Sequence, residues 1–212
     1  MARSPNGIRR LPEKAVHDRG VIDAILDEGY VCHVGYLIDG RPVVIPTLYV
    51  RDHDTILLHG STSSGISAAA RRNSPLSIAV TLVDGLVVAR SGFESSVNYR
   101  SVVVHGQGDV LEGTAHRRAL DLMVEGLIPG RLADIREPSD IEMRQTAVVA
   151  VPIDLVSAKV SQGPPEDDPT DIGTGVWAGV IPVTTTYGAP IASPDLEPDL
   201  KVPDYLRHYR RS

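Results

Sequence analysis

The residues best suited to chemistry lie in one short segment, residues 55–72, with the sequence TILLHGSTSSGISAAARR. An expected strand ends there in a loop rich in glycine, serine and threonine, and the loop opens an expected short helix at 67–72. Such a junction presents hydroxyl and main-chain N–H groups at the positive end of a helix dipole, which suits a phosphate group. A plain helix cap is the alternative interpretation. Because no Walker pattern is present, nucleotide hydrolysis is not indicated.

A second polar group is NYRS at residues 98–101, directly before an expected strand at 102–105. An amide, a phenol, a guanidinium and a hydroxyl follow one another at this strand entrance. They are either solvated turn residues or part of a binding site. In the second case Arg100 would pair with an anionic ligand in the mouth of a barrel.

Other reactive side chains give weaker signals. The seven histidines (17, 33, 53, 59, 105, 116 and 208) show no HxH or HExxH spacing, so no metal site is expected. Cys32 is the sole cysteine, which excludes an internal disulfide and a cysteine-based zinc site. It lies in an apolar run and is expected to be an inert core residue. The absence of GxSxG gives no support to a serine hydrolase.

The composition is that of a globular protein built around β-structure. The chain has 212 residues, 42% of them hydrophobic and 23% charged, and only 4% aromatic, so valine, isoleucine and leucine must fill the core. The formal net charge of −6 argues against a nucleic-acid partner. No apolar run approaches the roughly 20 residues of a membrane span. The basic start, MARSPNGIRR, is followed by no apolar core, so no secretory signal and a cytoplasmic location are expected.

Hydrophobic periodicity predicts helices near the ends of a series of hairpins. Asp18 is expected to cap a first helix that ends before Gly29, Thr114 to cap a second that runs to Leu127, and Ser139 with Glu142 to form a capping box. Asp39-Gly40 is expected to join two strands, 30–38 and 41–50, in a tight hairpin. Further strands are expected at 55–59, 77–82, 86–90, 101–111, 147–153 and 155–160, with a turn at Asp84-Gly85. We therefore predict a mainly β fold, a small closed barrel of about six antiparallel strands with peripheral helices.

The composition changes at residue 161. The 52 residues from there to Ser212 hold 8 of the 16 prolines, and WAGVIPV at 177–183 is their one apolar segment. We predict a domain over 10–160 and an extension over 161–212 that packs on the barrel or at a dimer interface. Trp177 is expected to be buried there and to line a cofactor site, because a large apolar side chain gains from burial.

Four segments together resemble the flavin-nucleotide-binding branch of the pyridoxamine 5′-phosphate oxidase-like, FMN-binding split-barrel superfamily, which is related to the nitroimidazole-resistance proteins. They are CHVGYLIDGRPVVIPTLYV, LLHGSTSS, VTLVDGLVVARSGFESSVNYRSVVVHG and SAKVSQGPP…VWAGVIPV. They occur in the family's order and cover most of residues 10–183. The resemblance implies a six-stranded antiparallel split barrel and an obligate homodimer with two FMN sites at the subunit interface.

The resemblance also implies site residues. The main chain along the flavin ring edge would be that of Val44, Ile45, Pro46 and Thr47. The ribityl phosphate would lie on the loop residues His59, Gly60, Ser61, Thr62 and Ser64. The side chains approaching from a neighbouring strand would be those of Tyr99, Arg100 and Ser101.

One departure from the family pattern affects the phosphate loop. The family usually has Arg or Lys just after the serine of this loop, and here Gly65 and Ile66 follow Ser64. Lys159, Arg71 or Arg72 would have to supply the missing positive charge. FMN, another flavin-like cofactor and haem therefore stay open as ligands. Restoring the cation with Gly65→Arg is predicted to tighten phosphate binding, unless Lys159 or Arg71 already fills that role.

The resemblance implies an FMN-dependent oxidoreductase for a small organic substrate, in which the flavin carries hydride or electrons. The sequence identifies no general acid or base. The alternative is a non-enzymatic flavin- or haem-binding protein for storage, sensing or delivery.

Overall fold

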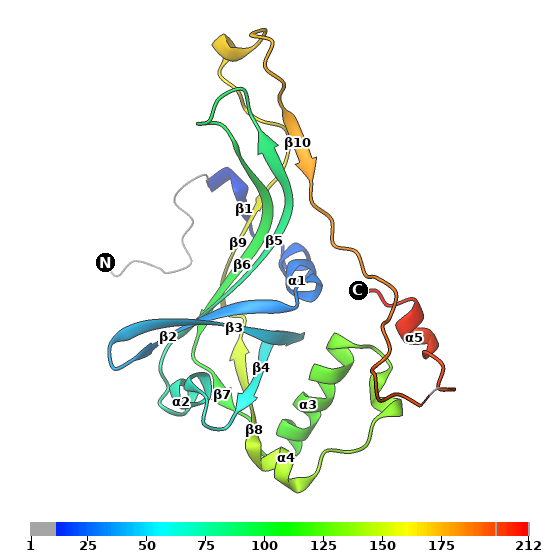
Figure 1. Ribbon diagram of the computed structural model, residues 1–212. Helices are drawn as coiled ribbons and strands as arrows, with labels where there is room; N and C mark the ends of the chain where they lie inside the picture. Colours follow the sequence, from blue (N-terminus) through cyan, green and yellow to red (C-terminus); the bar gives the residue numbers. More distant parts are fainter. Residues whose placement is uncertain (1–11, 198, 212) are drawn as a thin grey trace.

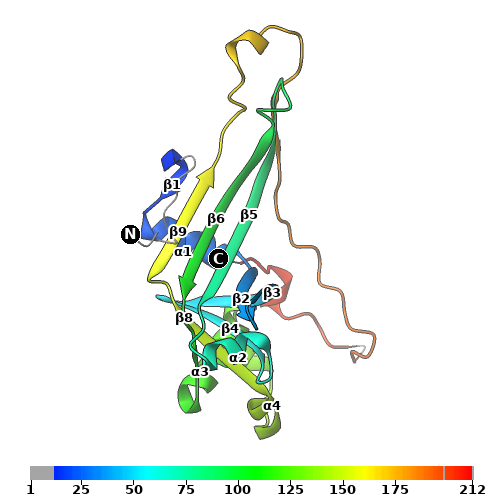
Figure 2. The same ribbon diagram turned by 90° about the vertical axis from the view of Figure 1, so that its left-hand side faces the viewer.

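The structure, a computed structural model, describes residues 12–197 and 199–211 (Figure 1). It is built from antiparallel strands with a few helices around them, so the predicted mainly β fold is confirmed. Along the sheet the strand order is β1-β9-β6-β5-β2-β3-β4-β8-β7, and β10 pairs with β5 outside this path. Figures 1 and 2 show a long ribbon of β5, β6 and β9 that extends away from the β3, β4 and β8 region.

Strand β3 joins the two halves of the sheet. The first hairpin consists of β2 (Val31–Ile38) and β3 (Arg41–Asp52), and the second pairs β3 with β4 (Thr55–Ser61). The N-terminal part of β3 pairs with β2 and its C-terminal part with β4. Asp39 and Gly40 both have positive φ angles, 49° and 75°, as the tight hairpin turn requires. The predicted hairpins in this region are confirmed.

The remaining strands complete the two halves of the sheet. The half that contains β2 also has β5, β6, β9, β1 and β10, whereas β8 and β7 join β4. Their bounds are β1 Ala15–Val16, β5 Leu76–Val88, β6 Ser96–Gly106, β7 Asp109–Val110, β8 Thr146–Pro152, β9 Leu155–Ser161 and β10 Gly179–Pro182.

Local capping signals set where several helices begin. Asp18 accepts a hydrogen bond from the Val21 N–H at the start of α1 (3.1 Å), and Ser139 with Glu142 forms the predicted capping box. Thr114 lies inside the first turn of its helix rather than at the cap, because that helix begins one residue earlier. The helices are α1 Arg19–Glu28, α2 Gly65–Arg71, α3 Gly113–Leu127, α4 Asp140–Gln145 and α5 Asp204–Arg207, with single 3₁₀ turns η1 Pro12–Lys14, η2 Arg131–Asp134 and η3 Pro169–Asp171.

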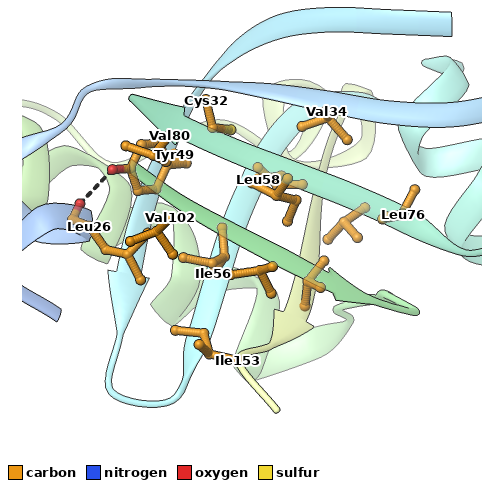
Figure 3. Packing of buried hydrophobic residues seen from close by; sticks show 14 of the residues in the cluster. Leu26, Cys32, Val34, Tyr49, Ile56, Leu58, Leu76, Val80, Val102 and Ile153 are labelled. Atoms are coloured by element: carbon orange, nitrogen blue, oxygen red, sulfur yellow. Dashed lines mark hydrogen bonds between the residues drawn. The ribbon is translucent and has the colours of Figure 1, made fainter. Parts of the chain in front are cut away.

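The main core lies between the strands and helices α1 and α2 (Figure 3). Tyr49 is fully buried there and donates its hydroxyl to the carbonyl oxygen of Leu26, 2.6 Å away. Cys32 is buried in the same cluster, and this burial raises the pKa of its thiol to about 12. A smaller cluster, centred on Val148 and Met123, packs α3 against β4 and β8.

Two expectations about β5 and β6 are wrong. The chain does not turn at Asp84-Gly85: β5 continues to Val88 with a register shift between Val83 and Gly85. A Cβ atom on Gly85 would lie 2.9 Å from Cγ1 of Val180 in β10, so glycine here permits the close approach of β10. The NYRS residues consequently lie inside β6 rather than at a strand entrance.

The C-terminal extension adds one strand to the sheet and then returns to the helices. After β10 the chain leads to α5 (Figure 1), and beyond α5 Tyr209 donates its hydroxyl to the carbonyl oxygen of Leu127 at the end of α3 (2.6 Å). Tyr187 and Tyr209 contact Tyr30 through their hydroxyls, and the Arg211 guanidinium lies 4.2 Å from the centre of the Tyr30 ring. Trp177 is 65% exposed and lies against Gly179, so its expected burial on the barrel is not found within one chain, and its place at an interface or cofactor site stays a prediction.

Candidate functional site

The glycine- and serine-rich loop between β4 and α2 is held in shape by its own hydroxyl groups. Ser64 caps α2 by accepting a hydrogen bond from the Ser67 N–H (3.1 Å). The Ser67 hydroxyl in turn donates to the Ser61 carbonyl oxygen (3.1 Å). Ser61 and Ser63 share a hydroxyl–hydroxyl contact of 2.9 Å at the exposed rim of the loop. We call residues 61–64 the hydroxyl loop; His59, two residues earlier in β4, is not part of it.

Two side chains from outside the hydroxyl loop complete its surroundings. Arg71 donates from Nη1 to the Thr62 carbonyl oxygen (2.8 Å), which places one guanidinium beside the loop. The ring of Tyr36, from β2, lies against Gly65: a Cβ atom there would stand 2.8 Å from Cε2 and Cζ of that ring and nearer still to its hydroxyl. The position where the family usually has a cation is therefore filled by the Tyr36 phenol. Sequence reasoning did not identify Tyr36.

A second set of predicted residues shares the outer face of the large sheet. Register pairs place Pro46 beside His33 and Ser101 beside Lys159 and Thr81. Val44 and Tyr99 belong to the same face, because they lie two residues from Pro46 and Ser101 in their strands. The alternating residues Cys32, Val80 and Val102 form the buried inner face. We call Val44, Pro46, Tyr99, Ser101 and Lys159 the sheet-face set.

Three residues that the resemblance implies for the site point the other way. Ile45 and Thr47 are the register partners of Val34 and Cys32 on the inner face. Arg100 forms ion pairs with Glu28 of α1 and with Asp84, the latter at 2.8 Å. The hydrogen bonds that Arg100 donates to these two carboxylates raise the pKa of its guanidinium above its usual value. Arg100 thus ties β6 to α1 and does not face the sheet-face set.

The hydroxyl loop and the sheet-face set are far apart within one chain. The loop packs on Tyr36 at the inner face of β2, and the set lies on the outer face. Gly35, Ser77 and His105 form one row across β2, β5 and β6, and Ser101 lies four residues further along β6. With about 4.8 Å between strands and 3.4 Å per residue, Ser101 lies about 10 Å across and 14 Å along the sheet from Gly35, whereas Val44 is the register partner of Gly35. Within one chain, the hydroxyl loop therefore lies on the other face of the sheet from Tyr99, Ser101 and Lys159.

The free surface of the β2–β3 hairpin is apolar. Leu37 is 53% exposed and Val44 is 64% exposed, and both lie on the outer face. A cleft of about 670 Å³ runs from this hairpin to His105 and Leu155. Large apolar side chains that remain together at a surface mark an interaction site.

A further cleft of about 650 Å³ lies beside α3. Its floor comes from β3, β4 and β8, and its walls from α3, η2, the segment 135–138 and α4. The interior is mostly aliphatic, whereas His59, Arg117 and Arg136 are among the polar residues that line it. His59 therefore faces a cleft that the sequence did not predict. We call this the α3 cleft.

The described residues give no indication of a metal centre or of a membrane helix. Residues 12–197 and 199–211 contain no group of three or more His, Cys, Asp or Glu side chains arranged to bind a metal ion. Within the same residues, no helix is both long and apolar enough to cross a membrane.

Comparison with known proteins identifies the family. Residues 18–160 match the family model described as pyridoxamine 5′-phosphate oxidase, which covers the strands and helices from α1 to β9. The chain belongs to this family, and the split-barrel resemblance is confirmed. No curated protein matches the chain.

Solved structures include two relatives that match nearly the whole chain. The FAD and haem binding protein from Mycobacterium smegmatis is 39% identical, with a TM-score of 0.88 over 92% of this chain and 96% of that one. The flavocytochrome Anf3 from Azotobacter vinelandii is 33% identical, with a TM-score of 0.93 over 99% and 98%. A candidate 5-nitroimidazole resistance protein from Bacteroides thetaiotaomicron is 26% identical, with a TM-score of 0.59 over 69% and 86%.

Proposed function

We propose that the protein is a flavin-binding redox protein whose flavin sites are each built from two copies of the chain. The observation that carries this proposal is the separation of the hydroxyl loop from the sheet-face set on opposite faces of one sheet. In a two-fold dimer, the loop of one chain can meet the sheet face of the other, and symmetry then creates two equal sites. The exposed apolar surface of the β2–β3 hairpin supports such a pairing, because it would be covered in the dimer.

Each group has a distinct role in the proposed site. The hydroxyls of Ser61 and Ser63 and the nearby Arg71 would bind the flavin phosphate. The sheet-face set would come from the partner chain, with the main chain of the Val44 and Pro46 region along the ring edge and Tyr99, Ser101 and Lys159 beside it. The bound flavin supplies hydride and electron transfer to or from a small organic substrate. Arg100 has none of these roles, because its side chain points to the opposite face from Tyr99 and Ser101 and pairs there with Glu28 and Asp84.

We propose FAD as the flavin, with FMN as the second candidate. Two relatives that match more than nine-tenths of this chain are an FAD and haem binding protein and a flavocytochrome. The hydroxyl loop also favours FAD on electrostatic grounds. FMN ends in a phosphate monoester of up to two negative charges, and each phosphate of FAD is a diester with one. A loop with hydroxyl donors and Arg71, but with glycine at the family's cation position, is better matched to the single charge.

The same relatives favour haem as a second cofactor of this chain. A protein that holds both would pass electrons between an organic donor and an acceptor, and would be an oxidoreductase. If it holds a flavin without turning over a substrate, the alternative is storage, sensing or delivery of the cofactor.

Titration of the flavin-free protein tests the proposal. FAD and FMN are added separately, and quenching of flavin fluorescence reports binding. We expect tighter binding of FAD than of FMN, and a loss of at least tenfold for Ser61→Asp, which places a negative charge in the loop. Ser193→Asp, in the C-terminal extension, is the matched control and should bind like the parent. Binding of neither flavin, or equal binding by Ser61→Asp and the parent, would refute the proposal.

A further inference from the structure

The α3 cleft has the properties of a cofactor site, and it is separate from the proposed flavin site. Its volume of about 650 Å³ falls within the roughly 300–1,000 Å³ of small-molecule sites. Its interior is formed by aliphatic side chains such as Leu120, Val124 and Leu127. The polar residues of the lining are His59, Arg117, Asp121, Arg136, Glu137, Glu142 and Thr146. A large, flat and mostly apolar ligand suits this composition.

The walls of the cleft are fixed by specific hydrogen bonds rather than left as a loose loop. The carboxylate of Glu125 accepts hydrogen bonds from the N–H groups of Gly130 (2.8 Å) and Leu132 (3.0 Å), which shapes the turn after α3. From the C-terminal extension, Tyr205 donates its hydroxyl to Asp134 (2.5 Å) in η2. The extension therefore braces the outer wall of the cleft.

The polar residues of the cleft form two kinds of group. His59 is the histidine among the lining residues, and its side chain is exposed, so an imidazole nitrogen is accessible to a metal. Arg117 and Arg136 add two guanidinium groups to the lining, beside the carboxylates of Asp121, Glu137 and Glu142, which line the cleft as well. Arg117 uses Nε and Nη2 for Asp121 and Glu137, and Arg136 pairs with Glu142 at 2.6 Å. A guanidinium has five donors, so each can bind a further carboxylate.

We propose that the α3 cleft binds haem, with His59 as the axial ligand of the iron and Arg117 and Arg136 as partners of the propionates. An imidazole that faces an apolar cavity is a common axial ligand of haem iron. The aliphatic interior matches the macrocycle, and the arginines match its two carboxylates. This inference rests on the proposed flavin and haem function, since the relatives make haem the expected second ligand.

The cleft beside the β2–β3 hairpin is the competing position for haem, and its lining residues fit haem less well. That cleft also contains a histidine, His105, but no arginine or lysine is among its lining residues. It adjoins the exposed apolar surface around Val44, which the proposed dimer would cover. The structure therefore assigns haem to the cleft that contains His59.

Haemin titration of the flavin-free protein tests the assignment. The absorption spectrum of the haem reports both binding and axial ligation. We expect one haem per chain and a shifted Soret band for the parent and for His105→Ala. We expect His59→Ala to lose that spectrum and to bind haem at least tenfold more weakly. Even the residues that only hydrogen-bond to a metal ligand change metal affinity by about 10–100-fold when they are mutated. Added imidazole should restore the ligated spectrum in His59→Ala.

A second variant and a parallel titration with FAD distinguish a specific loss of haem binding from a loss of the fold. Val124→Trp fills the cleft without touching His59 and should also abolish haem binding. FAD affinity should stay within twofold of the parent in both variants, which shows that the fold is intact. A parent-like Soret band in His59→Ala, or its loss in His105→Ala, would overturn the assignment. Failure of the parent to bind haem while it binds FAD would overturn this inference and leave the flavin proposal standing.

Discussion

The ring of Tyr36 occupies the space in which a side chain at position 65 would begin. A Cβ atom on Gly65 would lie 2.8 Å from Cε2 and Cζ of Tyr36, well inside van der Waals contact. Tyr36 is buried in the core, so the ring has little freedom to move away. This pair explains why the phosphate loop departs from the family pattern. It also contradicts the expectation that Gly65→Arg would tighten phosphate binding.

Gly65→Ala is therefore expected to destabilise the fold by about 1–3 kcal/mol, the usual cost of forcing extra volume into a packed site. In a Tyr36→Ala background the same change should be neutral, or should stabilise by up to about 1 kcal/mol, since alanine is a better helix residue than glycine. Urea unfolding of the four proteins in this double-mutant cycle measures the difference. Equal costs of Gly65→Ala in both backgrounds would show that the two residues do not interact.

Two serines of the hydroxyl loop are expected to have separable roles. Ser64→Ala removes the cap of α2 and should cost about 1 kcal/mol of stability. Ser61→Ala leaves that cap in place and should weaken flavin binding about tenfold or more, because a hydrogen bond to a charged group contributes about 1.5–3 kcal/mol. Thermal unfolding without flavin and fluorescence titration with flavin separate the two effects. The assignment fails if Ser61→Ala binds flavin as the parent does.

Arg100 is expected to act on stability and not on cofactor binding. Arg100→Ala removes ion pairs with Glu28 and Asp84 that are only partly shielded from solvent, so the free energy of unfolding should fall by about 1 kcal/mol. The flavin dissociation constant should stay within twofold of the parent value. A large loss of flavin affinity with unchanged stability would instead place this guanidinium in the site.

The turn that shapes the α3 cleft should be sensitive to acid. Hydrogen bonds from the main-chain N–H groups of Gly130 and Leu132 hold the pKa of Glu125 below its usual value of 4.5. A carboxylate with a lowered folded-state pKa contributes stability above its unfolded-state pKa and loses it as the pH falls through the lowered value. Glu125→Gln should thus be less stable than the parent at pH 7. The stability difference between the two proteins should shrink below about pH 4.5, and a constant difference would contradict this account.

Cys32 should be unreactive in the folded protein. Burial raises the pKa of its thiol to about 12, so almost no thiolate is present at neutral pH, and the side chain is fully buried. A thiol reagent such as Ellman's reagent should label one group per chain in urea and none in buffer. Rapid labelling of the folded protein would show that this part of the core opens.

Local signals in the sequence predicted much of the fold. Asp39-Gly40 specifies its hairpin within two residues, and Asp18 and Ser139 specify helix starts within one turn. The continuity of β5 past Gly85 was not predictable in this way. It depends on β10, which comes from a distant part of the chain and packs on that glycine.

In the candidate site too, neighbouring residues predicted one part, and the other part depends on contacts between distant segments. The hydroxyl loop was found because its residues are consecutive, and its resemblance to the family rests on that order. The Tyr36 ring against Gly65 and the cleft beside His59 arise where β2, β4, α3 and η2 meet in space, and no spacing along the chain indicates them. Alternation alone could have shown that Arg100 and Ser101 point to opposite faces once residues 98–101 are placed within a strand.

The most direct test of the central claim, a flavin site shared between two chains, is complementation in a mixed dimer. Ser61→Asp disables the hydroxyl loop and Ser101→Asp disables the sheet-face set. The two variants are co-expressed with different tags, and the mixed species is purified through both tags and checked by light scattering. In a two-fold dimer one site then receives both changes and the other receives neither. We predict that neither variant alone binds FAD tightly and that the mixed dimer binds about one FAD per two chains with parental affinity. A mixed species that binds no FAD, or a protein that remains a monomer and binds FAD as the parent does, would contradict the shared site.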